Sequence, residues 1–457
     1  MIFAWTGTNS IFRCGGSRPG DHSLHLAENP SIGQPAINTI VDHLFRHESG
    51  KLVAVLTRVF GIDNMHLAED VVQDSIAEAL SQWEFRGIPD NPAGWLFRVA
   101  RNKAFNILSR EKYQRKYAAG VRHAAEQDGA AESSLEAFFS DQEVLDDQLR
   151  MIYTCCHPAI SPDSQVALAL KTLCGFSVPE IARSFLTTEE NIKKRLTRAR
   201  QAIRDTSVPF DVPAGEELQR RTGVVLETIY LLFNEGYSAS TGDDLIRYDL
   251  CSEAIRLAGL VEQHPAIRDK SDVRALLSLM YFNASRFRAR QDASGRLLTM
   301  AEQDRSLWDR QLITNGLFFL DQSAREGHGS VYHLLAAISA HHCMAFHYSS
   351  TDWKNILQLY DGLVRMDPSP VVRLNRIIAL SKVAGPLIAL QELEPLRQDP
   401  MLSDYPLLYS TEAELYMQTD QFPAAAESLG KAISLSTLEK ETDWLKAKLA
   451  SCREKKI

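Results

Sequence analysis

After a first stretch (1–36) rich in Gly, Ser, Pro and Asn, apolar residues recur every three or four positions and strand-like alternation is nearly absent. Apolar-periodic blocks cover 37–112 and 143–206, and each ends in a basic run. A stretch rich in Ala, Glu, Gln and Ser (113–142) predicts a linker between them, and a Pro- and Gly-containing segment precedes a long helical block, 216–457. We therefore expect an all-α chain of two compact domains and a helical array, preceded by a poorly ordered extension.

The block 143–206 predicts two capped helices joined by a tight turn. Ser177 and Glu180 have the spacing of a capping box, and Thr187 and Glu190 repeat it. The second helix has one apolar stripe, formed by Ile192, Leu196, Ala199 and Ile203. Its other face carries cationic and amide side chains, which suit phosphates and base edges: Asn191, Lys193, Lys194, Arg198 and Arg200. This pattern is typical of a helix-turn-helix with a recognition helix. The simpler alternative is a basic, solvated helix that binds no nucleic acid.

The block 37–112 predicts an acidic amphipathic helix followed by a basic one. The first has an apolar stripe of Val72, Ile76, Ala79 or Leu80, and Trp83. Asp70, Gln73 and Asp74 share another face, which suits a protein-docking surface, although this pattern taken alone favours an ordinary solvated face. The second helix carries a basic, amide-bearing surface that includes Arg98, Asn102, Asn106 and Arg110. Aromatic residues near it could stack on unpaired bases, but for Trp95 we favour a place in the core.

The block 216–457 contains a weak internal repeat. Ile356, Ala389 and Ala425 occupy equivalent positions, 33 and 36 residues apart. This spacing is close to the 34-residue tetratricopeptide period. Such repeats stack helix pairs into a superhelix with a concave binding surface.

Composition restricts the chemistry of the chain. With a formal net charge of −8, any DNA contact must come from a local basic surface. Seven cysteines without a repeated spacing favour a reducing, cytoplasmic location over a disulfide framework, and no apolar run is long enough to span a membrane. The clusters 155–157 and 341–343 contain Cys and His, but adjacent ligands are geometrically awkward, so we expect no metal. No phosphate loop or nucleophile motif occurs, so we expect no cofactor, no catalytic residue and no enzyme activity.

Three segments carry a resemblance to a known family. They are AEDVVQDSIAEAL (68–80), GWLFRVARNKAFNIL (94–108) and GFSVPEIARSFLTTEENIKKRLTRARQAIR (175–204). In order and separation they resemble regions 2 and 4 of sigma-70-type sigma factors of the extracytoplasmic-function class. The whole chain resembles the subgroup with a C-terminal tetratricopeptide-like extension, in which FNEGY (233–237) and EQDRSLWDR (302–310) recur.

This resemblance implies a role for each group of residues. It places Asp70, Gln73 and Asp74 on the helix that docks on core RNA polymerase. Asn102, Asn106 and Arg110, with Arg98 of the same surface, would read the −10 element, although the class often has Asp at position 106. The loop 85–93 would capture a flipped base. The helix entering the −35 major groove would present Asn191, Lys193, Lys194, Arg195 and Arg198.

The implied partners are core RNA polymerase and promoter DNA, together with a protein partner or an intramolecular contact through 216–457. The chain would recognise both promoter elements and support promoter opening, under regulation by its C-terminal domain. The alternative is a helix-turn-helix transcription regulator whose repeat domain senses a ligand or partner. That alternative predicts specific DNA binding without polymerase.

Overall fold

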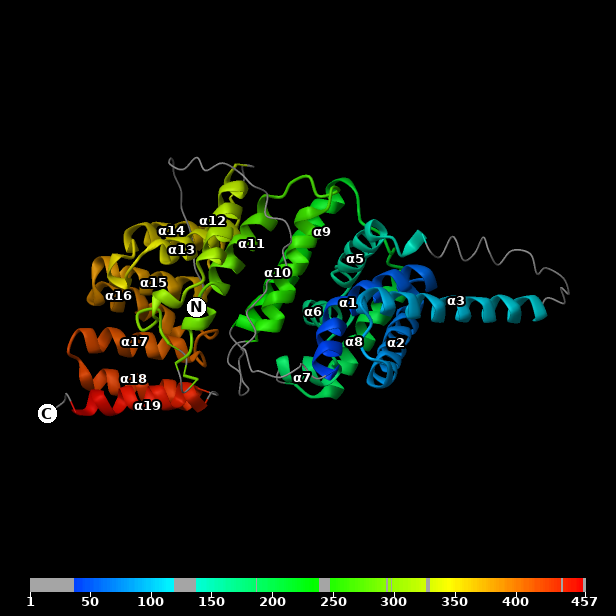
Figure 1. Cartoon of the computed structure of the whole chain (residues 1–457). Coiled ribbons are helices and arrows are strands. Elements are labelled where there is room, and N and C mark those ends of the chain that lie inside the picture. Colours follow the sequence, from blue (N-terminus) through cyan, green and yellow to red (C-terminus); the bar gives the residue numbers. More distant parts are fainter. Residues whose placement is uncertain are drawn as a thin grey trace. The chain divides into compact units, whose positions relative to one another are not determined.

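We analysed a computed structural model of the chain. It describes residues 37–118, 137–185, 187–237, 247–292, 295–296, 298–325, 329–436 and 439–454. Every secondary-structure element within these ranges is a helix, which confirms the expected all-α fold (Figure 1). The described residues form two compact units, one comprising 37–232 and 263–266, the other 233–262 and 267–454. No described helix is both long and apolar enough to cross a membrane.

The first unit begins with α1 (Ile37–Phe60), α2 (Met65–Arg86) and α3 (Pro92–Ala118). On α2, the predicted apolar stripe is buried at Val72, Ala79 and Trp83, whereas Leu80 is exposed, so Ala79 is the core residue of that pair. Trp95 of α3 is half-buried and packs edge-on against Trp83, with ring centroids 5.3 Å apart. The core position expected for Trp95 is therefore partly realised.

The second part of this unit holds four helices of the expected helix-turn-helix block, namely α5 (Asp141–Cys155), α6 (Pro162–Thr172), α7 (Val178–Ser184) and α8 (Glu189–Asp205). Helix α6 begins at the Ser161 N-cap with Pro162 in its first turn, where proline is well tolerated. Helix α1 packs along α5, so the two predicted domains contact each other within one unit.

Helix α9 (Gly215–Tyr237) starts the C-terminal block, yet its residues up to Leu232 belong to the first unit. Buried Arg221 donates from Nη2 to the Tyr153 carbonyl oxygen of α5. The Thr222 hydroxyl lies 2.5 Å from the Tyr153 hydroxyl, and Thr228 Oγ1 donates to Gln165 Oε1 of α6 at 3.2 Å. The first helix after the predicted boundary at residue 216 therefore packs on the helix-turn-helix block.

The second unit contains ten further α-helices within the described residues (Figure 1). They are α10 (Tyr248–Gln263), α11 (Ser271–Ala284), α12 (Arg310–Ala324), α13 (Val331–Met344), α14 (Trp353–Met366), α15 (Pro370–Ala384), α16 (Pro386–Leu393), α17 (Pro406–Gln418), α18 (Phe422–Leu435) and α19 (Glu439–Glu454). From α11 onward, each of these helices packs against the next one in the sequence. Neighbours in sequence are thus neighbours in space, as in a helical array.

The last six helices pair as three hairpins, α14–α15, α16–α17 and α18–α19. The three residues chosen for the internal repeat, Ile356, Ala389 and Ala425, are each the fourth residue of the first helix in a hairpin, and each is 0% exposed. The spacing read from the sequence is therefore the spacing of successive first helices.

Candidate polymerase and nucleic-acid interface

The start of α7 has the predicted capping box. The Ser177 backbone N–H and hydroxyl both donate to Glu180 Oε2, at 2.8 and 2.6 Å, and the Glu180 backbone N–H donates to Ser177 Oγ at 3.3 Å. The predicted cap of α8 was wrong by one residue, because Thr188 is the N-cap and its Oγ1 accepts from the Asn191 backbone N–H at 3.2 Å. Thr187 Oγ1 accepts instead from the Asn191 side-chain amide, at 2.9 Å.

Helix α8 divides into a buried apolar stripe and an exposed cationic face. The four stripe residues are at most 3% exposed, which confirms the predicted pattern: Ile192, Leu196, Ala199 and Ile203. The polar residues Asn191, Lys193, Lys194 and Arg198 are all exposed. A helix anchored through one side and cationic on the other can approach a duplex without unfolding any part of its domain.

The cationic side chains of this face differ in whether they are already paired with a carboxylate. Lys193 and Lys194 lie 3.5 and 2.9 Å from Glu189 and Glu190, in exposed pairs one turn apart that contribute little free energy. The Arg198 guanidinium forms no ion pair with any described residue.

Arg195 behaves differently, because it holds α8 within its own domain. Its Nη2 lies 3.2 Å from Asp163 of α6, and its guanidinium stands 5.6 Å from the centre of the Phe185 ring. Arg195 is also half-buried. At least one of its N–H groups is therefore engaged by Asp163 within the domain.

Helix α3 presents the second predicted surface. Arg98, Asn102, Asn106 and Arg110 are all exposed and follow one another at intervals of four residues, so they run along one side of the helix. Lys103 lies away from this row and pairs with Glu78 of α2, with Nζ and Oε2 2.9 Å apart.

The loop between α2 and α3 carries an exposed aromatic side chain. Phe85 is 84% exposed at the end of α2, which stops at Gly87, a residue with φ +77°. Asn91 Oδ1 accepts from the Gly94 backbone N–H at 2.8 Å and so caps α3. An exposed apolar ring therefore lies at the end of α2, seven residues in sequence before Pro92, where the basic helix begins.

On α2, Asp70, Gln73 and Asp74 are exposed, and neither carboxylate forms an ion pair with a described residue. Their neighbour Glu69 is 9% exposed, and both of its carboxylate oxygens accept from Arg200 Nη2 of α8 at 2.8 Å. The acidic face is thus accessible to a partner, whereas the preceding residue, Glu69, forms an ion pair within the unit.

Two contacts between the predicted domains were missed by sequence reasoning. One is Glu69–Arg200, and the other is Arg58 of α1, which pairs with Glu143 and Asp147 of α5. Each partner lies more than 80 residues from the other in sequence, and no local pattern predicts such a pairing. Arg200 was recognised only as part of a cationic face.

Among the described residues, no group of three or more His, Cys, Asp or Glu side chains is arranged to hold a metal. Cys155 and Cys156 are buried, and Cys155 Sγ lies 3.3 Å from the Thr172 hydroxyl. Burial raises the pKa of both thiols, that of Cys156 to about 12. Burial also lowers the pKa of His342 well below its usual range.

Comparison with known proteins identifies three domains in the chain. Residues 44–113 match Sigma-70 region 2, residues 150–203 match Sigma-70 region 4, and residues 221–324 match a family of unknown function, DUF6596. A protein of Rhizobium meliloti (strain 1021), described as uncharacterized, is 37% identical over 387 residues, which cover 84% of this chain and 90% of the relative. No solved structure matches the chain significantly. The chain therefore belongs to the sigma-70 family of transcription initiation factors, as a member with regions 2 and 4 and a C-terminal extension that contains DUF6596.

Proposed function

We propose that this chain directs core RNA polymerase to promoters through three separate surfaces. The acidic face of α2 (Asp70, Gln73 and Asp74) binds the polymerase, the exposed row on α3 reads the −10 element, and the cationic face of α8 reads the −35 element. The observation that carries the proposal is the geometry of α8, which is capped, buried along one stripe and cationic on the opposite, exposed side.

In the proposed mechanism, cationic side chains provide affinity for DNA, and amide side chains provide sequence specificity. Exposed lysine and arginine side chains on α8 and α3 neutralise phosphates, which gives affinity and a dependence on salt. Amide side chains on the same faces, such as Asn102 and Asn106, can make base-edge contacts worth roughly 1–3 kcal/mol each. Opening near the −10 element costs unstacking energy, which capture of a flipped base by the loop beside Phe85 would offset.

On α8 the proposed contacts are of two kinds. Asn191, Lys193, Lys194 and Arg198 meet the −35 groove directly, because they are exposed. Arg195 contributes either by holding α8 against Asp163 or by exchanging that carboxylate for a phosphate. The polymerase carries out the nucleotide chemistry.

A charge reversal at Asp70 tests the polymerase-binding surface. We expect Asp70→Arg to abolish core binding, measured by fluorescence anisotropy of the labelled chain, and to abolish run-off transcription. Glu427→Arg is the matched control, since Glu427 is an exposed carboxylate on α18 with the same change of charge. If Asp70→Arg bound the core normally, while the chain alone bound specific DNA, the alternative of a conventional helix-turn-helix regulator would replace this proposal.

We also infer that the hairpins from α14 onward are tetratricopeptide-like and that the extension regulates the factor, through a protein partner or an intramolecular contact. The equivalent buried positions in α14, α16 and α18 support the repeat. A truncation should remove 238–457 and keep α9, because α9 packs on α5 and α6. The expected result is altered transcription with core binding retained, and unchanged transcription from several promoters would exclude a regulatory role.

A further inference from the structure

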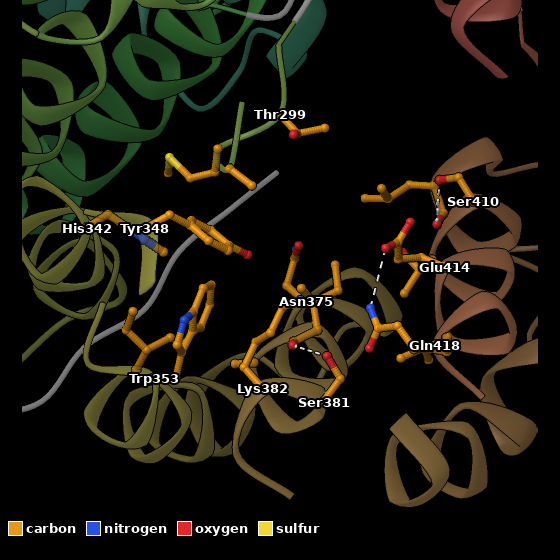
Figure 2. A pocket seen from close by; sticks show the side chains of 18 of the residues that line it. Thr299, His342, Tyr348, Trp353, Asn375, Ser381, Lys382, Ser410, Glu414 and Gln418 are labelled. Carbon is orange, nitrogen blue, oxygen red and sulfur yellow. Dashed lines mark hydrogen bonds between the residues drawn. The ribbon is translucent and has the colours of Figure 1, made fainter. Parts of the chain in front are cut away.

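The second unit has a partly open cavity of about 300 Å³ among α13, α14, α15, α17 and α19 (Figure 2). This volume is within the range of small-molecule sites. All of its lining residues belong to the second unit.

Aromatic rings form much of the wall. Tyr348 and Trp353 meet edge-on with centroids 5.6 Å apart, and Tyr360 and Trp444 line the cavity from α14 and α19. Figure 2 shows Tyr348 and Trp353 on one side of the space and Ser410, Glu414 and Gln418 on the other. A ligand held here would place an apolar body against the rings and its polar group among the polar and charged side chains of the lining.

The charges within the cavity leave one cation in excess among its described residues. Glu414 Oε2 accepts from Lys448 Nζ at 2.8 Å, and that ammonium also lies 4.3 Å from the centre of the Trp444 ring. Lys382 is an exposed residue at the same cavity; its ammonium forms no hydrogen bond or ion pair with a described residue, and its charge, together with that of Lys448, helps to lower the pKa of Glu414. Asn375, which is 3% exposed, places a further polar side chain in the lining.

Two buried guanidinium groups, those of Arg286 and Arg305, contact residues that line the cavity. Arg305 Nη1 donates to the carbonyl oxygens of His342 and Ala345, at 2.6 and 2.7 Å. Arg286 Nη1 lies 2.9 Å from Met300 Sδ. His342 and Met300 themselves line the cavity, so these cations add positive potential to this part of its wall.

This arrangement connects the two recurring motifs that the sigma-factor surfaces do not use. Arg305 belongs to 302–310, and its guanidinium stands 4.6 Å from the centre of the Trp308 ring in the same segment. Tyr237 ends the segment 233–237, and its hydroxyl accepts from Arg286 Nη2. Both motifs therefore position the guanidinium groups behind the cavity.

We propose that this cavity binds a small organic carboxylate with an aromatic or branched apolar body, whose anionic group meets Lys382 and whose body packs against Tyr348 and Trp353. The inference does not depend on the proposed promoter contacts, since it concerns the second unit alone. The same chemistry could come from a free acid or from the carboxyl end of a peptide.

The test is isothermal titration calorimetry on the full chain with paired probes. Indole-3-acetate, octanoate and a tetrapeptide ending in phenylalanine are compared with their neutral amides. We expect at least one carboxylate to bind saturably, and its amide to bind roughly ten- to a hundredfold more weakly, because a hydrogen bond to a charged group is lost. Preference for the free acids or for the peptide identifies the source of the ligand.

Two pairs of variants locate the site. Lys382→Met should weaken carboxylate binding by roughly tenfold or more, whereas Lys354→Met, which changes an exposed lysine outside the cavity, should not. Ser410→Phe should block binding by filling the cavity, and Ser434→Phe, on the exposed side of α18, should leave it unchanged. Equal binding of acids and amides, no binding of any acid, or insensitivity to Lys382→Met would each overturn the proposal.

Discussion

The ion pair between Glu69 and Arg200 should hold the two sigma regions together in the free factor. Arg200 Nη2 bonds to both Glu69 oxygens at 2.8 Å, and the two side chains are 24% and 11% exposed. A hydrogen bond to a charged group contributes roughly 1.5–3 kcal/mol, and partial exposure of the pair reduces this to about 1–2 kcal/mol. Replacing Arg200 by Gln should therefore shift the equilibrium from associated to separated regions by roughly five- to thirtyfold.

The assay is double electron–electron resonance on the full chain. Spin labels at Glu84→Cys and Gln201→Cys report on α2 and α8, because both positions are exposed, and Cys14→Ser removes one native thiol. The other six cysteines are buried. We expect the parent chain to show mainly a short distance between the two labels. In Arg200→Gln, a larger fraction of molecules should show a longer distance.

A double-mutant cycle with Glu69→Gln isolates the coupling between the two residues. Glu78→Gln is the control, because Glu78 pairs with Lys103 within region 2 at a similar distance, 2.9 Å. A coupling free energy below about 0.3 kcal/mol would refute the reasoning, since it would lie within ordinary additivity. The same refutation would follow if the control moved the distances as far as Arg200→Gln does.

Three further predictions concern the first unit. In the holoenzyme, Arg198→Gln should make the salt dependence of −35 duplex binding shallower by about 0.9 in slope, because one phosphate contact is lost; an unchanged slope would remove Arg198 from the interface. Ser177→Ala should destabilise the unit by about 1 kcal/mol in calorimetric unfolding, and restoration by Ser177→Asp would support loss of the cap as the cause. Burial raises the pKa of Asp147 to about 6 despite the nearby Arg58 and Arg150, so the folded state binds this proton more tightly than the unfolded chain. The stabilisation that this proton gives to the folded state should be fully present below pH 4 and should decline as pH rises through 6. In denaturation series from pH 4 to 8, Asp147→Asn should reduce the change in the free energy of unfolding by on the order of 2 kcal/mol.

Local patterns predicted the helices well because capping and burial act over a few residues. The box at Ser177 and Glu180 and the stripe from Ile192 onward required no knowledge of distant contacts. The errors lie where two residues compete locally. Thr187 and Thr188 can both cap α8, and the backbone conformation at Thr188, with φ −80° and ψ 152°, decides between them.

Contacts between elements far apart in sequence could not be predicted from periodicity. Glu69 occurs within an acidic run, and nothing in that run distinguishes it from Asp70, although the first is buried against Arg200 and the second is exposed. Likewise, Arg286 and Arg305 approach one cavity only through the packing of the second unit. The positions of these two guanidinium groups are set by the tertiary structure.

The adjacent thiols of Cys155 and Cys156 have a consequence for signalling. Because burial raises the pKa of both, hardly any thiolate exists at neutral pH, and thiolate is the form that peroxides and electrophiles attack. The Cys155–Cys156 pair is therefore unsuited to sensing oxidants while region 4 stays folded. An oxidative signal that acts through thiolate chemistry would therefore have to enter this factor at a residue other than Cys155 or Cys156.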